Sequence, residues 1–542
     1  MIPRSLSALA LASVAASCSS SAIRAGSSGA ATAGTLPMSR AERTNYMETS
    51  HYADVVAFVD SLRTLGAPLA FGSIGRTAES REIPYVVASR PLVHTPAQAH
   101  ATGKPIVYVQ GNIHAGEVEG KEAMQAMIRD LAFAAHANVL DSIVLIVVPI
   151  YNADGNERFG PQVRQRGEQN GPELVGQRPN AAGLDLNRDY IKAEAPETRA
   201  SLAMFNAWDP DVFVDLHTTD GSLHGYALTY SPSLNPAAPL GDYTRSLLAE
   251  LRNRVRMRAG YEIFDYGNFN DRGGLEVSTD STHSGWYTYD HRPRFGTNYY
   301  GLRNRISILS EAFSHDPFEV RVKATYAFVS QLLSLVAERG DEIRRMEQRG
   351  ASRSPGEGIA LRSALPTSAP SALVRFEILA RTGDTLRTQP GLDRGLRRTG
   401  EIRTRPMPVF DRFVPTLVRP MPQAYFVGDT GNVARLRLHG VLVEPFAPAD
   451  RAFRLERFAI DSVMRSPRPF QGHNEVRLTG HWEPAGTQHD NASTYVVRTN
   501  QPLGRLAMYL LDPESDDGLV TWNLFDGPIA AGFYPVLRSA TP

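Results

Sequence analysis

The chain has 542 residues, more than one hydrophobic core usually supports, so we expect two or three domains. Hydrophobic residues make up 42% and charged residues 21%, values typical of a globular chain that exclude a mainly disordered one. Lys+Arg and Asp+Glu number 57 each, so the net charge is zero. This balance argues against a general attraction to nucleic acid or to an anionic membrane, and we predict no nucleic-acid partner.

The first residues have the layout of an export signal. Arg4 precedes an apolar run over residues 6–16, and small residues follow, so we predict a signal peptide over residues 1–25. The run is too short for a membrane span, and no later stretch reaches the roughly 18 apolar residues that a transmembrane segment needs. The only cysteine, Cys18, stands in a stretch that resembles a bacterial lipoprotein cleavage box, and is a candidate lipid anchor. We predict an exported protein that is periplasmic, an outer-membrane lipoprotein or secreted.

Residues 26–40 are rich in Gly, Ser, Ala and Thr and predict a flexible leader. From residue 41 to 349, apolar β-branched runs alternate with helical patterns, among them a helix from about Tyr46 to Leu65 and a long closing helix over about 317–349. This alternation predicts an α/β domain with a mixed sheet flanked by helices. The predicted strands are 85–87, 105–110, 142–150, 212–216 and 305–309.

The pattern changes after the long helix. Residues 350–372 mix Gly, Pro and Ser with little periodicity and predict a linker. Residues 373–542 show short alternating runs between Pro, Gly and Asp-Gly turns, which predicts a smaller β-rich C-terminal domain. No motif in it indicates a role.

Two strand ends carry candidate metal ligands. His114 and Glu117 stand three residues apart after the strand 105–110, close enough for both to bind one ion. His217 ends the strand 212–216. Two imidazoles and one carboxylate, with a fourth position open for water, are typical of a catalytic zinc site. His224, in the following loop, is a rival ligand.

The order of five motifs then identifies a resemblance. The chain shows a strand followed by His-x-x-Glu, then Asn-Ala-Asp-Gly at residue 152, Asp-x-Asn-Arg at residue 185, Glu-Ala-Pro-Glu-Thr at residue 194 and Asp-x-His at residue 215. This series resembles the zinc carboxypeptidases of the carboxypeptidase A type over about residues 45–345. Two departures are small: Ala153 replaces the family's usual Pro, and Ala195 is inserted before Pro196.

The resemblance implies roles for the matching residues. His114, Glu117 and His217 would bind one zinc ion per chain, and Asp185 would hold the His114 ring through its other nitrogen. Asn187 and Arg188 would bind the terminal carboxylate of a peptide substrate, a task that suits a planar guanidinium.

Two further catalytic roles follow from the resemblance. Arg166 would polarise the scissile carbonyl, with Arg164 as the alternative. Glu311, at the end of the last strand, would be the general base for a zinc-activated water. Its competitors, Asp316 and Glu319, stand near the start of the long helix, where helix capping also explains them. The family's catalytic Tyr has four candidates, which are Tyr287, Tyr289, Tyr299 and Tyr300.

The resemblance implies a zinc metallocarboxypeptidase that hydrolyses the peptide bond next to a free C-terminal carboxylate. A cell-wall peptide amidase or a small acyl-amino-acid deacylase on the same scaffold is the alternative enzyme. A non-catalytic binding protein is the alternative from another class, and the complete set of metal ligands together with Glu311 argues against it. The side-chain specificity of the pocket stays open.

Overall fold

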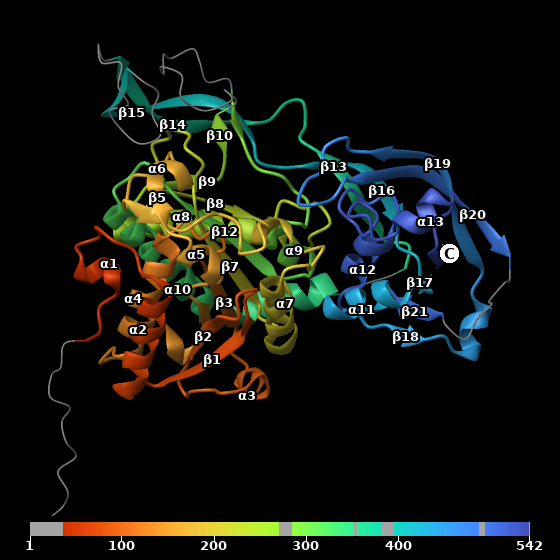
Figure 1. Cartoon of the computed structure of the whole chain (residues 1–542), viewed down its shortest axis with the longest axis horizontal. Coiled ribbons are helices and arrows are strands. Elements are labelled where there is room, and N and C mark those ends of the chain that lie inside the picture. Colours follow the sequence, from red (N-terminus) through yellow and green to blue (C-terminus); the bar gives the residue numbers. More distant parts are fainter. Residues whose placement is uncertain (1–35, 270–284, 352–354, 382–394, 487–493, 541–542) are drawn as a thin grey trace, which may run out of the picture. The chain divides into compact units, whose positions relative to one another are not determined.

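The central feature of the structure is an eight-stranded mixed sheet (Figure 1). The sheet belongs to a compact unit that spans residues 37–542. The predicted signal peptide, its Cys18 and most of the predicted leader lie outside the described residues. The computed structural model describes residues 36–269, 285–351, 355–381, 395–486 and 494–540.

The sheet has the order β1-β2-β4-β3-β7-β12-β8-β9. The pairs β3–β4, β3–β7, β7–β12 and β8–β9 are parallel, and the pairs β1–β2, β2–β4 and β8–β12 are antiparallel. This confirms the predicted mixed sheet. The strands are β1 (Leu69–Arg76), β2 (Glu82–Ala88), β3 (Ile106–Gly111), β4 (Val144–Val148), β7 (Val212–Thr218), β8 (Leu228–Pro232), β9 (Ile263–Asp265) and β12 (Ile306–Ala312).

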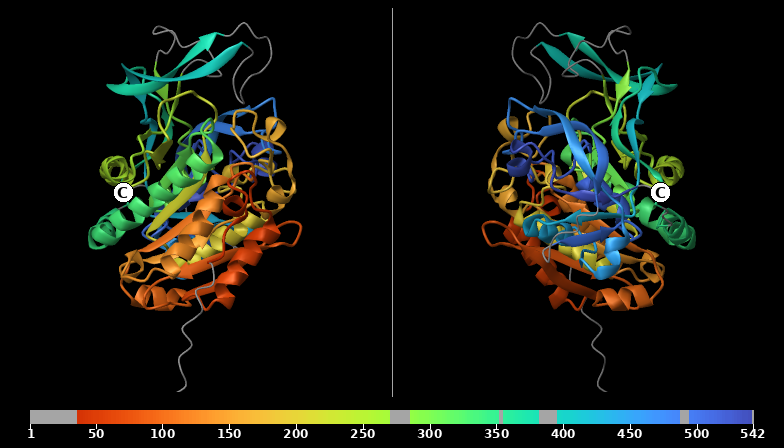
Figure 2. Two further views of the ribbon diagram at one scale, coloured as in Figure 1. Left: turned by 90° about the vertical axis from the view of Figure 1, so that its left-hand side faces the viewer. Right: turned by 90° about the vertical axis from the view of Figure 1, so that its right-hand side faces the viewer.

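The central strands are buried on both faces, because helices cover the sheet on each side. Val107 and Val109 of β3 face a core formed with α2 (Tyr52–Thr64), α4 (Glu119–Ala132), α8 (Gly241–Ala259) and α10 (Phe318–Ala351). Helix α10 runs beside α4 on this face (Figure 2). Ile106 and Tyr108 point to the opposite face, since successive strand residues alternate.

The opposite face carries α7 (Pro196–Trp208) and α9 (Gly296–Leu302). Its core continues without a break into residues 359–536, where Leu361, Tyr425 and Trp522 are fully buried. The α/β segment and the C-terminal segment therefore share one hydrophobic core. The domain boundaries at residues 349 and 373 stay a prediction. The predicted linker 350–372 contains the whole of strand β13 (Gly358–Ala364).

The C-terminal part is rich in β-structure, as predicted, and also carries helices. A six-stranded sheet has the order β18-β21-β17-β22-β19-β20, and β13 pairs with β16 (Val414–Pro420). The long pair β14 (Ser371–Arg381) and β15 (Leu396–Phe410) joins β11 (Trp286–Tyr287) and β10 (Asn268–Phe269). The remaining C-terminal elements are β17 (Ala424–Val427), β18 (Glu444–Pro445), β19 (Leu455–Arg465), β20 (Val476–Gly486), β21 (Tyr495–Arg498), β22 (Leu537–Ser539), α11 (Thr430–Leu438), α12 (Gly504–Leu511) and α13 (Asp526–Ala530).

Short elements complete the described chain. The predicted helix near Tyr46 begins only at Tyr52, because Asn45 and Tyr46 adopt positive φ angles and break the helical path. Within the described residues, none of the helices combines the length and apolar character of a membrane span. The short elements are α1 (Arg40–Arg43), α3 (Pro96–Ala101), α5 (Ala153–Glu157), α6 (Gln162–Gln165), β5 (Gly160–Pro161) and β6 (Leu174–Val175).

Candidate metal centre and active site

Three neighbouring strands bring predicted site residues to one edge of the sheet. The strands β3, β7 and β12 are adjacent and parallel. His114 follows β3, His217 lies in β7, and Glu311 lies opposite His217 in the register of β12. Because the carboxyl ends of parallel strands meet at the same edge, side chains far apart in the sequence converge there.

His114, Glu117 and His217 form a compact group of potential metal ligands. One donor atom from each lies within 4.8 Å of the others, and all three residues are buried. The Nδ1 atom of His114 lies 2.9 Å from Oε1 of Glu117, and Nδ1 of His217 lies 3.0 Å from Oε2 of Glu117. The two Nδ1 atoms are 3.2 Å apart. Both imidazoles therefore turn the same ring nitrogen towards one point.

A carboxylate oxygen lies close to the outward ring nitrogen of each histidine. Nε2 of His114 lies 3.1 Å from Oδ1 of Asp185, which is the contact expected from the sequence. Nε2 of His217 lies 3.0 Å from Oδ2 of Asp215, a residue for which the sequence indicated no role. Asp215 precedes His217 by two residues, so both side chains lie on the same face of the strand. The Asp-x-His spacing could therefore have predicted this contact.

These contacts fit a zinc ion. A carboxylate that accepts the Nε2 proton leaves the Nδ1 lone pair free to bind a metal. Two such nitrogens and one carboxylate are a donor set that zinc prefers, and a fourth coordination position stays available. The residues that are present therefore suit the predicted zinc ion.

The two carboxylates at this edge have opposite pKa shifts. Burial raises the pKa of Glu311 well above its ordinary value, the charge of Glu117 raises it further, and His217 opposes both. Burial would also raise the pKa of Glu117, but the charges of His114 and Arg166 outweigh it and hold that pKa well below its ordinary value. Glu117 is thus ionised as a ligand must be, whereas Glu311 takes up a proton more readily.

A cavity of about 70 Å³ opens onto the metal ligands. Of the eight predicted site residues, six line it, Asp185 lies behind His114, and Arg166 lies behind Glu117. The cavity also contains Arg178 and two tyrosines that the sequence did not assign. Its lining residues are His114, Glu117, Arg178, Asn187, Arg188, His217, Thr218, Asp220, Tyr266, Tyr289, Phe295, Thr297, Leu309 and Glu311.

Arg166 is engaged in supporting contacts. Its guanidinium donates to Oε1 of Glu117 at 3.1 Å and to the carbonyl oxygens of Thr218 and Thr219 at 2.9 Å each. It is buried and does not line the cavity, and Arg164 is exposed in α6. Arg166 therefore supports a metal ligand, which differs from the predicted contact with the scissile carbonyl.

Arg178 reaches the cavity in its place. Its Nε donates to Oδ2 of Asp185 at 2.9 Å, its Nη1 lies 3.6 Å from Oε1 of Glu117, and the side chain is 34% exposed. Arg178 precedes Asp185 by seven positions, and the six residues between them form a turn. Asn180 folds this stretch back on itself by accepting the N–H groups of Ala182 and Leu184.

Asn187 and Arg188 lie in a short 3₁₀ turn after Asp185. The carboxylate of Asp185 accepts the N–H of Asn187 at 2.9 Å, and the amide oxygen of Asn187 accepts the N–H of Gly296 at 2.8 Å. The guanidinium of Arg188 lies over the ring of Phe295, 3.9 Å from its centre. Among the described residues, no carboxylate lies within ion-pair distance of Arg188, although the charges of Asp185 and Asp290 act on it from farther away. Its Nη1 donates to the backbone carbonyl of Asn187 at 2.9 Å.

The other sequence candidates lie elsewhere. Asp316 and Glu319 do not line the cavity, and Glu319 pairs with Lys323 at 2.6 Å on the surface. His224 is not part of the metal group and packs against Phe313, 4.4 Å between ring centres. Of the four tyrosines considered, only Tyr289 lines the cavity, together with Tyr266, a residue not considered. Tyr287 is outside the lining, and Tyr299 and Tyr300 are buried in the core beside α7.

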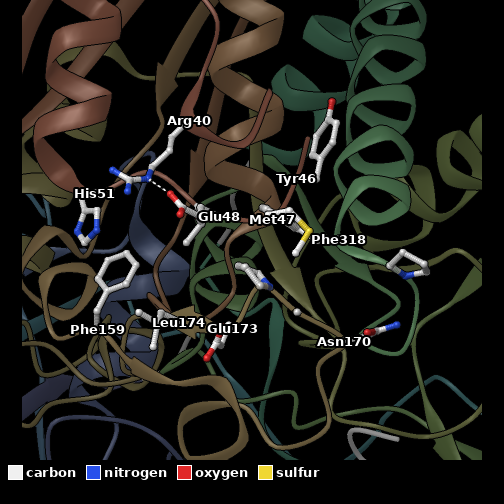
Figure 3. A pocket seen from close by; sticks show the side chains of 14 residues that line it. Arg40, Tyr46, Met47, Glu48, His51, Phe159, Asn170, Glu173, Leu174 and Phe318 are labelled. Atoms are coloured by element: carbon white, nitrogen blue, oxygen red, sulfur yellow. Dashed lines mark hydrogen bonds and ion pairs between the residues drawn. The ribbon is translucent and has the colours of Figure 1, made fainter. Parts of the chain in front are cut away.

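A second, larger cavity of about 500 Å³ lies away from this chemistry (Figure 3). Its wall includes His51 stacked on Phe159, 3.9 Å between ring centres, and the ion pair of Arg40 with Glu48. It contains none of the predicted site residues. The smaller cavity is therefore the candidate active site.

The comparisons with known proteins agree with this geometry. Residues 56–301 match the family model described as zinc carboxypeptidase. Carboxypeptidase 2 of Trichophyton equinum is 24% identical over 85% of this chain and 81% of its own length, and carboxypeptidase D of Mus musculus is 31% identical over 27% of this chain and 10% of its own. A metallo-carboxypeptidase structure from Burkholderia cenocepacia is similar at a TM-score of 0.40, with 17% identity over 53% of this chain and 70% of that one. The segment 56–301 of this chain, which carries all three metal-ligand candidates, thus matches the zinc carboxypeptidase family.

Proposed function

We propose that this chain is an exopeptidase that hydrolyses the last peptide bond of a substrate with a free C-terminal carboxylate. The observation that carries the proposal is the shared cavity, in which the metal ligands, Glu311 and the guanidinium of Arg188 all lie. A partly desolvated cation that no described carboxylate pairs with directly favours an anionic ligand. The end of a peptide is the part of a substrate that offers a carboxylate beside a hydrolysable amide.

Zinc would be held by His114, Glu117 and His217. When bound by two imidazoles and a carboxylate, this metal supplies Lewis acidity and lowers the pKa of a coordinated water to about 7. The side chains of the cavity then supply proton transfer, polarisation of the scissile carbonyl and binding of the substrate carboxylate.

Glu311 accepts the proton of the attacking water on its carboxylate and passes it to the leaving nitrogen. Its place opposite His217 puts this carboxylate beside the metal ligands, and its raised pKa favours proton uptake. Arg178 donates to the carbonyl oxygen of the scissile bond, where negative charge develops. Its half-exposed guanidinium can do so while Nε stays bonded to Asp185. Arg178 replaces Arg166 in this proposal.

Arg188 and Asn187 bind the carboxylate of the substrate. Phe295 fixes the plane of the Arg188 guanidinium, and the bond from Gly296 fixes the Asn187 side chain. Two rigidly placed donors select a planar carboxylate over an amide, because an amide brings no charge and adds its own N–H donors.

A product analysis tests the proposed function. Purified protein with zinc is incubated with one peptide sequence prepared as the free acid and as the C-terminal amide, and the products are read by mass spectrometry. Loss of single residues from the free acid, with little reaction of the amide, is the expected result. Internal cleavage of both peptides at equal rates would contradict an exopeptidase, and reaction only with peptidoglycan stems or acylated amino acids would point to the alternative substrates.

We also propose that the protein is exported, on the basis of Arg4 and the apolar run over residues 6–16. Expression with and without residues 1–25, followed by fractionation, tests this proposal. A mature N-terminus at Cys18 that carries lipid would establish the anchor, whereas an intact, unprocessed N-terminus in the cytoplasm would contradict export.

A further inference from the structure

A tight turn in the C-terminal part lies against the active site. Residues 470–473, called the Gln471 turn below, connect the ends of β19 and β20. Phe470 and His473 exchange both backbone hydrogen bonds, at 2.8 and 3.0 Å. Gln471 and Gly472 have φ angles of 50° and 82°, which is the two-residue hairpin turn with positive φ at both central positions.

The side chain of Gln471 reaches the segment that holds the site. Its Oε1 accepts the backbone N–H of Asp185 at 2.8 Å, although the two residues are 286 positions apart. Asp185 in turn contacts three groups of the site: Nε2 of His114, Nε of Arg178 and the backbone N–H of Asn187. Gln471 is thus one hydrogen bond away from Asp185, the residue that links His114 to Arg178 and Asn187.

The backbone of Gln471 is unusual for its residue type. Asn, Asp and Gly are the usual residues at a central position with positive φ, because a longer side chain is disfavoured there. Residues held in such regions concentrate where a specific contact is needed. At this position the longer amide spans the gap to Asp185.

The same part of the chain also holds the far end of this segment. Nε2 of His473 lies 3.0 Å from Oε1 of Glu194, and Nζ of Lys192 lies 4.7 Å from the centre of the Trp522 ring. Lys192 also donates to Asp189 at 3.0 Å. The C-terminal part therefore contacts the segment 185–194 at both ends, through Gln471 at Asp185 and through His473 at Glu194. Asn187 and Arg188 lie between these two contacts.

We propose that Gln471 is a positioning residue of the active site. By fixing the backbone of Asp185, it aims the Asp185 carboxylate at His114 and Arg178 and sets the place of Asn187 and Arg188 in the cavity. The C-terminal part is then an integral part of the peptidase site, a role that no motif in its sequence indicates. This inference rests on the proposed function for its kinetic effect and on the metal centre alone for its effect on zinc affinity.

The test uses the full-length protein and two single variants. Gln471→Gly removes the amide but suits the positive φ, so the turn itself is retained. Asn474→Ala is the matched control, because Asn474 lies in the same loop and its side chain donates only to the carbonyl of Ser466 in its own region. The measurements are the melting temperature, the zinc dissociation constant by chelator competition, and kcat and KM with a free-acid peptide.

For Gln471→Gly we expect an unchanged melting temperature, a zinc dissociation constant raised about threefold to tenfold, and kcat/KM lowered about fivefold to tenfold, the scale of one lost hydrogen bond and a displaced outer partner of a metal ligand. Asn474→Ala should match the wild type in every measurement. Wild-type zinc affinity and kcat/KM in Gln471→Gly would overturn the proposal, as would equal losses in both variants. If the wild-type protein binds zinc but releases no C-terminal residue, the proposed function fails, while weaker zinc binding by Gln471→Gly still supports the positioning role.

Discussion

The metal centre and the carboxylate-binding turn are built in different ways. His114, Glu117 and His217 come from the ends of two neighbouring strands in one sheet, and the register of these strands places them. Asn187 and Arg188 lie outside the sheet, in a short turn held by α9 on one side and by Gln471, through Asp185, on the other. The proposed chemistry thus depends on near neighbours in the sheet, whereas the proposed binding of the substrate carboxylate depends on remote segments.

This difference separates the expected effects of mutation. A change at the strand ends should abolish metal binding or the chemical step for every substrate. A change in the turn should leave the metal in place and alter which substrate reacts, because a binding interaction and a chemical step enter kcat and KM differently.

The largest effect is expected for His217→Ala. This variant removes one of three metal ligands, so purified protein should lose most of its zinc, and activity should fall by about 10³-fold or more with the Lewis acid. Zinc content by elemental analysis and peptide hydrolysis are measured on the same preparation. The control is His224→Gln, which should keep its zinc because His224 packs away from the metal group. Full zinc content in His217→Ala would show that the ligand set is wrong.

Glu311→Gln should lower the rate of hydrolysis without lowering the zinc content. The amide cannot accept a proton, so kcat should fall about 10²- to 10⁴-fold, while zinc content stays near one equivalent. Elemental analysis and single-turnover hydrolysis check both quantities. Activity close to the wild type would move the general base to another carboxylate, of which Asp220 is the one that also lines the cavity.

Arg178 and Arg166 should respond differently to removal. Arg178→Ala should retain its fold and zinc and lose about 10²- to 10³-fold in kcat, because a donor to the developing oxyanion is removed. Arg166→Ala removes the guanidinium paired with the buried Glu117 and the donor to two carbonyl oxygens, and should lower the free energy of unfolding by about 3 kcal/mol. Melting temperature and kcat measured on both variants distinguish the roles. A stable Arg166→Ala protein with a lost kcat, beside an active Arg178→Ala, would return the catalytic role to Arg166.

Much of the site could be predicted from the sequence, because its motifs sit directly at strand ends. The alternation of apolar runs with helical patterns predicted the mixed sheet, and a histidine that ends a buried strand must lie at the edge of that sheet. The contact of Asp185 with His114 followed from the resemblance and is present in the structure.

The arginine that lines the cavity is Arg178 and not the predicted Arg166, for a physical reason. Arg164, Arg166 and Arg178 all lie between the second and third motifs, and sequence spacing alone does not show which one is buried. In the folded chain Arg166 is buried and donates to Glu117, whereas the turn at Asn180 places Arg178 in the cavity lining. The Gln471 contact joins residues 286 positions apart, so it depends on the shared core of the two parts and has no local signal in the sequence.

The central claim is that Arg188 binds the free C-terminal carboxylate of a peptide substrate. Charge-assisted hydrogen bonds of this kind contribute about 1.5–3 kcal/mol, which corresponds to about ten- to a hundredfold in kcat/KM. The most direct measurement is the ratio of kcat/KM for a free-acid peptide to that for its C-terminal amide, in the wild type and in Arg188→Ala, with zinc content confirmed in both. We predict a large ratio in the wild type that falls close to one in the variant, with the loss on the free acid. An unchanged ratio in zinc-loaded Arg188→Ala would contradict the account.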